Sequence, residues 1–190
     1  MITKLQAAEL QLNSAIMLFF ENHDLLSSHT LAAASREITD DLCEKQVSQI
    51  FNAEAARLGD PLKVRLSFRE EIKILIKPEH LKEAMALFRR RQNFLKHADR
   101  DPNAEMEEIQ SKDLALEIFF AIKNFALLAQ RVTREMTTFL YWIGVAHPEL
   151  VKDPSGDFSK KISECREMWR EPYSKETLNG IHDALKLHRG

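Results

Sequence analysis

An arginine, an amide and a histidine share one face of a helix predicted between residues 79 and 98. The apolar residues of this segment recur at spacings of three and four, which is the pattern of an amphipathic helix. At about 100° per residue, Arg90, Asn93 and His97 fall within about 60° of one another on the opposite face. Their spacing therefore predicts that three polar side chains act together.

These three side chains suit the chemistry of a phosphodiester. A guanidinium such as that of Arg90 can hold a phosphate with two hydrogen bonds. The imidazole of His97 titrates near neutral pH and can accept or donate a proton, and the Asn93 amide can orient a hydroxyl group or a water molecule. Arg89 and Lys96 lie at the edge of the same face and add positive charge. The same residue types are also usual on a solvated helix face that binds nothing.

The stretch RRRQNFLKHADRDP resembles the Arg-x(4–6)-His motif of HEPN-domain proteins. A long amphipathic first helix, the polar break ENHD, and a second helix rich in small residues are also similar to the start of that family's fold. By position, His97 matches the histidine of the family, and Arg91 or Arg90 matches its arginine. The resemblance covers residues 1–145 and leaves out the tail.

The resemblance implies an α-helical bundle that pairs as a homodimer. It also implies a metal-independent RNase site, formed where two copies of the motif meet, or a stress-response protein of the toxin type. In the family a polar residue usually follows the arginine directly; here Gln92 follows Arg91, and Asn93 comes one position later. Arg91 lies within the apolar arc of the helix, so only Arg90 is clearly on the same face as His97. We expect catalytic roles for His97, Arg90, Arg91 and Asn93.

A second hypothesis comes from a different class of function. The chain could be a non-catalytic helical interaction module whose polar face binds a protein partner or closes a dimer. The expected partners are therefore a second copy of the chain and either RNA or another protein. If the Arg90 and His97 side chains of two subunits meet in a shared open cleft, the enzyme hypothesis gains; if they point separately into solvent, it loses.

Other motifs for chemistry do not occur in the sequence. The phosphate-binding glycine loops GxGxxG and GxxxxGK[ST], the metalloprotease motif HExxH and the Glu-x-x-His pairs of di-metal bundles are all missing. The two cysteines, Cys43 and Cys165, lack a CxxC partner and favour reduced thiols. We expect no cofactor and no metal.

The composition favours a helical protein of the cytoplasm. Among 190 residues there are only 5 glycines and 6 prolines, fewer than a fold with many tight turns needs. The net charge of −2 does not by itself indicate a nucleic acid or membrane partner. Polar residues interrupt the most apolar stretch, 114–132, so no membrane span is expected.

The periodicity predicts an all-α fold, a single helical bundle of about five to seven helices. Residues 1–152 would form the bundle core and residues 153–190 a helical extension packed on the same domain. For segment 60–78 the sequence favours a helix but also permits a short strand. The expected helices are 2–22, 28–46, 79–98, 111–132 and 133–146. A further helical turn or two is expected at 47–58, and one or two helices in the tail, at 160–169 and 174–188.

Three of these helices carry specific expectations. In the helix at 2–22, the stripe of Leu5, Ala8, Leu12, Ile16 and Phe19 recurs at spacings of three and four and predicts the core face. The helix at 111–132 has apolar residues around its whole circumference, which predicts the central and most buried helix. For helix 28–46 the apolar stripe predicts a core face, with Ser27 or Ser28 as the cap. His29 and Arg36 lie opposite that stripe and are expected at the surface. The expected core face of this helix consists of Leu31, Ala34, Ile38 and Leu42.

Overall fold

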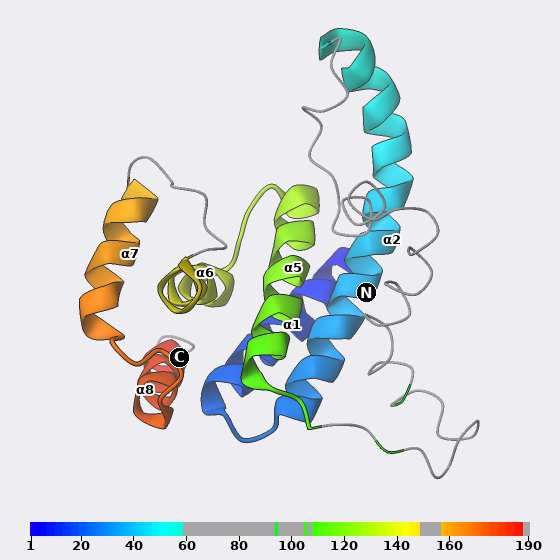
Figure 1. Ribbon diagram of the computed structural model, residues 1–190. Coiled ribbons are helices and arrows are strands. Elements are labelled where there is room, and N and C mark those ends of the chain that lie inside the picture. Colours follow the sequence, from blue (N-terminus) through cyan, green and yellow to red (C-terminus); the bar gives the residue numbers. More distant parts are fainter. Residues whose placement is uncertain (59–93, 95–104, 106–107, 149–156, 188–190) are drawn as a thin grey trace.

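The computed structural model describes residues 1–58, 94, 105, 108–148 and 157–187, and Figure 1 shows their arrangement. Within these residues every regular element is an α-helix and no strand occurs, which confirms the predicted all-α class. Segment 60–78 and most of the predicted helix 79–98 lie outside the described residues. The helices are α1 (Lys4–Glu21), α2 (Leu25–Leu58), α5 (Ser111–Ala129), α6 (Arg134–Ala146), α7 (Asp157–Met168) and α8 (Lys175–Lys186).

Helices α1 and α2 form an antiparallel pair joined by a short turn (Figure 1). Thr3 and Gln6 form a reciprocal capping box at the start of α1. Asn22 ends that helix in the left-handed conformation, which asparagine adopts more readily than most residues. The next helix begins where Asp24 accepts a hydrogen bond from the Ser27 backbone N–H, at 2.9 Å. Asp24, and not Ser27 or Ser28, therefore satisfies the free N–H at the start of α2.

Helix α2 differs in length from the prediction. It runs without a break from Leu25 to Leu58, so the helix predicted at 28–46 and the separate helical turns predicted at 47–58 are one element. Figure 1 shows its first half beside α1 and α5, while its second half extends past them.

The hydrophobic core is built around α1, which contacts α2, α5, α6 and α8. Its buried side chains include Ala8, Leu12, Ile16 and Phe19, as the predicted stripe required, and Leu5 is half-buried against the same core. Phe19 meets Trp142 of α6 edge to face, with ring centroids 4.9 Å apart. Aromatic pairs of this geometry contribute about 0.5–1.5 kcal/mol beyond their burial, so α1 and α6 are held by specific ring contacts.

Helix α5 packs against α1, α2 and α6, as a central helix should. It begins after Gln110 with Ser111 as its first residue, and no side chain caps it, although serine at this point of the sequence would predict a Ser111 cap. It ends at Ala129 and not near Val132. Helices α1 and α5 bury seven residues each, and Phe119 and Phe120 are only half-buried. The expectation that 111–132 is the single most buried helix is therefore wrong, because α1 and α5 share the centre.

The C-terminal helices join the same core. α7 packs on α6 and α8 packs on α1, and α8 contributes the buried side chains Leu178, Ile181 and Leu185. The segment between them is fastened to α6 by the Trp142 indole, which donates to the Pro172 carbonyl at 2.8 Å, and by a 2.5 Å hydrogen bond between the His147 ring and the Tyr173 hydroxyl. The boundary predicted at residue 152 stays a prediction.

Candidate functional site

The predicted site lies outside the described residues. Of helix 79–98 the structure describes Phe94 alone, which is helical and half-buried. Arg90, Arg91, Asn93 and His97 are not placed, so their convergence and their catalytic roles stay predictions.

Within the described residues, the polar cluster richest in charge lies between α2 and α5. The Arg36 guanidinium donates to Asp40 Oδ2 at 3.2 Å, one turn along α2, and to Glu117 Oε1 of α5 at 2.6 Å. The Asn124 amide, also from α5, donates to Asp40 Oδ1 at 2.8 Å. One guanidinium, two carboxylates and one amide therefore connect the two helices through charged hydrogen bonds, which are stronger than neutral ones.

This cluster is almost fully enclosed. Arg36 is 4% exposed, and Asp40 and Asn124 are 0% exposed. A buried charge is tolerated where partners satisfy it, and removing one partner is strongly destabilising. Because a substrate could not reach these atoms without moving α2 from α5, we interpret the cluster as a structural connection and not as a reaction site.

The buried face of α2 overturns the prediction for this helix. Of the residues expected in the core, Leu31 is half-buried and packs against it, whereas Ala34, Ile38 and Leu42 are half-buried and are not part of it. His29 and Arg36, expected at the surface, are both 4% exposed. The side chains that are buried on α2 are small or polar: Ser28, His29, Ala32, Ala33, Ser35, Arg36, Thr39, Asp40 and Cys43.

Small residues explain how α1 and α2 approach so closely. The Ser28 hydroxyl donates to the Ala15 carbonyl at 2.7 Å, and the Ser35 hydroxyl donates to the Ala8 carbonyl at 2.9 Å. Both bonds join a short side chain of α2 directly to the backbone of α1. The spacing Ser28, Ala32, Ser35, Thr39 repeats at four, three and four residues and marks this face in the sequence. A search for apolar residues alone misses it.

The two thiols do not behave as nucleophiles. Burial, together with the negative charges of Asp40 and Glu44, raises the pKa of Cys43 to about 12. Burial also raises the pKa of Cys165. Since the thiolate is the reactive form, burial makes both thiols poor nucleophiles, and neither forms a disulfide.

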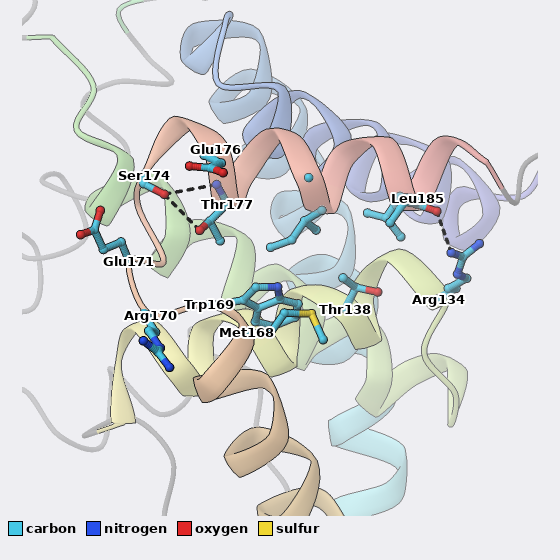
Figure 2. A pocket seen from close by; sticks show the side chains of 13 residues that line it. Arg134, Thr138, Met168, Trp169, Arg170, Glu171, Ser174, Glu176, Thr177 and Leu185 are labelled. Carbon is cyan, nitrogen blue, oxygen red and sulfur yellow. Dashed lines mark hydrogen bonds between the residues drawn. The ribbon is translucent and has the colours of Figure 1, made fainter.

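A groove of about 680 Å³ opens between α6, α7 and α8. Figure 2 shows Trp169, Met168 and Thr138 at its centre, with α8 along one side. Arg134 lies at one end, where it donates to the Ala184 carbonyl at 3.0 Å. Glu171 and Glu176 lie at the other end, beside Ser174. A volume of this size is within the range of binding sites for small molecules or short peptide segments.

A second hollow, of about 520 Å³, lies at the α1–α2 turn and is lined by polar residues that include His23, Asp24 and Glu108. Hydrogen bonds from Ser27 lower the pKa of Asp24. Among the side chains that the structure describes, no group of three or more His, Cys, Asp or Glu residues could hold a metal ion. Among the helices that the structure describes, none has the length and hydropathy needed to cross a bilayer.

No family model matches the chain, and comparisons with curated proteins and with solved structures also give no match.

Proposed function

We propose that this chain is a HEPN-like homodimer that cleaves RNA without a metal ion. The observation that carries the proposal is the Arg-x(5–6)-His pattern of RRRQNFLKH on one predicted helix. The all-helical bundle is consistent with it, and so is the close antiparallel pair α1–α2 that begins the fold. The proposal assigns the acid–base role to His97 and phosphate binding to Arg90 and Arg91.

The proposed reaction follows from these side chains. The neutral imidazole of one His97 accepts the proton of an RNA 2′-hydroxyl, whose oxygen then attacks the adjacent phosphorus. The bond from phosphorus to the 5′-oxygen breaks, and that oxygen takes a proton from the protonated His97 of the second subunit. Arg90 and Arg91 stabilise the charge on the phosphate oxygens, while Asn93 orients the 2′-hydroxyl. The products are a 2′,3′-cyclic phosphate and a 5′-hydroxyl.

The dimer is part of the same proposal. Several arginines brought together about a two-fold axis repel one another, and an anion between them relieves that repulsion. We therefore expect Arg90→Glu to change dimerisation and anion binding together. If light scattering shows a strict monomer at micromolar concentration, the proposed dimer is wrong.

The test is an RNase assay in EDTA on a fluorescent single-stranded RNA, with the matching DNA as a substrate that lacks the 2′-hydroxyl. We expect His97→Ala to lower the cleavage rate by about 100-fold or more, the usual contribution of acid–base catalysis. His23→Ala is the matched control, because His23 is an exposed histidine on the α1–α2 turn. Arg90→Ala should lower the rate, whereas Arg166→Ala, at an exposed position of α7, should not.

Three outcomes would contradict the RNase proposal: full activity in His97→Ala, equal cleavage of the DNA, or cleavage only when a divalent metal is added. Each variant is also compared with the wild type in urea unfolding, so that a loss of folding is not taken for a loss of catalysis.

The alternative is a non-catalytic helical interaction module. The open groove between α6, α7 and α8 favours it, because such a groove is a common form of protein-binding site. The same assay decides between the two functions, since an interaction module gives no cleavage above the buffer rate.

A further inference from the structure

The groove between α6, α7 and α8 has an apolar lining in which Met168 and part of Trp169 are open to solvent, while Ile181 and Leu185 beneath them are buried. Ile181 and Leu185 of α8 line it from one side, and Trp169 lies at its centre (Figure 2). Met168 lines it from the end of α7 and is 75% exposed, which is unusual for a large apolar side chain. Methionine and tryptophan are enriched at protein interfaces, where they give up water readily and adapt to a partner.

Gly180 keeps this groove open. A Cβ atom built at Gly180 would have no atom within 4 Å, so the position faces empty space on the groove side of α8. Glycine inside a helix is less favourable than alanine by about 1 kcal/mol. No close contact requires glycine at this position. The missing side chain leaves space in the groove that the backbone of another helix can occupy.

The length of the groove suits a helix. Ser174 and Leu185 mark its two ends along α8 (Figure 2), and a helix of 12 residues such as α8 is about 18 Å long. That length accommodates about three turns of a second helix, whose apolar side chains at i, i+3 or i+4, and i+7 would lie along the floor.

The charges at the two ends of the groove differ in sign. Glu171 and Glu176, both exposed, lie at the end where α8 begins, and they outnumber the Arg170 guanidinium on the α7 side of that end. Arg134 lies at the opposite end, where α8 finishes. A helix complementary to this groove carries basic residues beside Glu171 and Glu176 and acidic residues beside Arg134.

We infer that this groove binds an amphipathic helix of a partner protein, antiparallel to α8, with basic residues in its last turn and acidic residues in its first. Helices favour acidic side chains near their start and basic ones near their end. The partner's own charge preference therefore matches Arg134 at one end and the two glutamates at the other. Antiparallel helix dipoles add to this preference. The inference is independent of the proposed RNase activity.

The experiment selects peptides from a displayed library of helical sequences on the full-length chain. Gly180→Trp serves for counter-selection, because a Cβ at that position meets no atom within 4 Å and the indole beyond it would occupy the groove. We expect the enriched peptides to share an apolar stripe, acidic residues in the first turn and basic residues in the last. One enriched peptide and its charge-swapped copy are then measured by fluorescence anisotropy.

The wild type should bind the enriched peptide about tenfold or more tightly than the charge-swapped copy. Gly180→Trp should lose binding by a similar factor, whereas Lys186→Trp, at an exposed position that does not line the groove, should retain it. The double variant Glu171→Lys/Glu176→Lys should prefer the charge-swapped peptide. Urea unfolding of all variants excludes a loss of folding as the cause.

Several results would overturn the inference. Enrichment that is equal on Gly180→Trp places the peptides elsewhere, and enriched sequences without the expected charge order contradict the assigned orientation. If Gly180→Trp converts a dimeric wild type into a monomer, the groove holds a second copy of the chain and not a different protein. None of these outcomes depends on RNA cleavage, so the two proposals succeed or fail separately.

Discussion

Helices α1 and α2 lie side by side, yet they bury opposite kinds of surface. The buried face of α1 is entirely apolar and includes Leu12, Ile16 and Phe19. That of α2 holds three hydroxyl groups, a histidine and the Arg36–Asp40 ion pair. Both faces are nearly inaccessible to water, so burial alone does not distinguish them.

The difference shows two ways in which a helix can be held in a bundle. On α1 the gain comes from apolar area removed from water, about 25 cal/mol per Å². On α2 the short side chains of Ser28 and Ser35 bond to the backbone of α1, and Arg36 and Asp40 bond to α5. Polar burial of this kind stabilises only while every partner is present.

The largest effect is expected for Arg36→Met, which keeps a similar volume and removes the charge. The Asp40 and Glu117 carboxylates then lose their shared cation in a buried place, and the free energy of unfolding should fall by about 3–5 kcal/mol. Urea unfolding near neutral pH measures it. Lys45→Met, at an exposed position of the same helix, should change stability by less than about 0.5 kcal/mol.

Adding Asp40→Asn to Arg36→Met sharpens the same measurement. Because the second change removes one of the two buried negative charges, the double variant should recover part of the lost stability. If the two losses simply add, the cluster does not act as a unit and the interpretation of α2 is wrong.

A somewhat smaller effect is expected on α1. Leu12→Ala removes a fully buried side chain from the core and should lower the free energy of unfolding by about 2–5 kcal/mol. Leu10→Ala is the control on the same helix, because Leu10 is 59% exposed; its effect should stay within about 0.5 kcal/mol. Equal losses at positions 10 and 12 would contradict the placement of α1.

The smallest effect is expected at the turn between the two helices. Asp24→Ala removes the side chain that accepts from the Ser27 N–H and should cost about 1 kcal/mol at neutral pH. The folded state lowers the pKa of Asp24, so this contribution is present above the ordinary aspartate pKa and is lost as the pH falls through the folded value. Urea unfolding over a pH series should therefore show the gap between wild type and variant closing in acid, and a gap that widens in acid would be inconsistent with this cap.

The comparison of α1 with α2 also explains how far the sequence predicts this fold. The stripe at Ala8, Leu12, Ile16 and Phe19 identified the core face of α1, because apolar burial leaves a direct periodic signal. On α2 the same periodicity predicts a core face of Leu31, Ala34, Ile38 and Leu42, which are half-buried, and a surface position for Arg36, which is buried. A charged residue is buried where it finds partners, and these lie far along the chain: Glu117 follows Arg36 by 81 positions, and Asn124 follows Asp40 by 84. No local pattern reports a contact of that kind.

The functional features differ in the same way: a local motif is visible in the sequence, and a surface made by distant segments is not. The motif of Arg90, Asn93 and His97 is local, so the sequence suggested it, but its assembly with a second copy depends on contacts that spacing does not determine. The groove was not predicted at all, since its floor combines Trp169 with residues of α8 that look like an ordinary core stripe. The exposed apolar side chain of the groove is Met168 at the end of α7, and no periodic pattern marks it.

The contact between α8 and α1 has a consequence for the order of folding. These helices meet although about 150 residues separate Glu21 from Lys175 in the chain, whereas α1 and α2 are joined by a turn of three residues, 22–24. Closing a long loop carries a larger entropic penalty than closing a short one, and distant contacts form more slowly. We expect the α1–α2 hairpin to form early and α8 to dock last. Until it does, the apolar side of α1 that α8 covers remains exposed to solvent and to other unfolded chains.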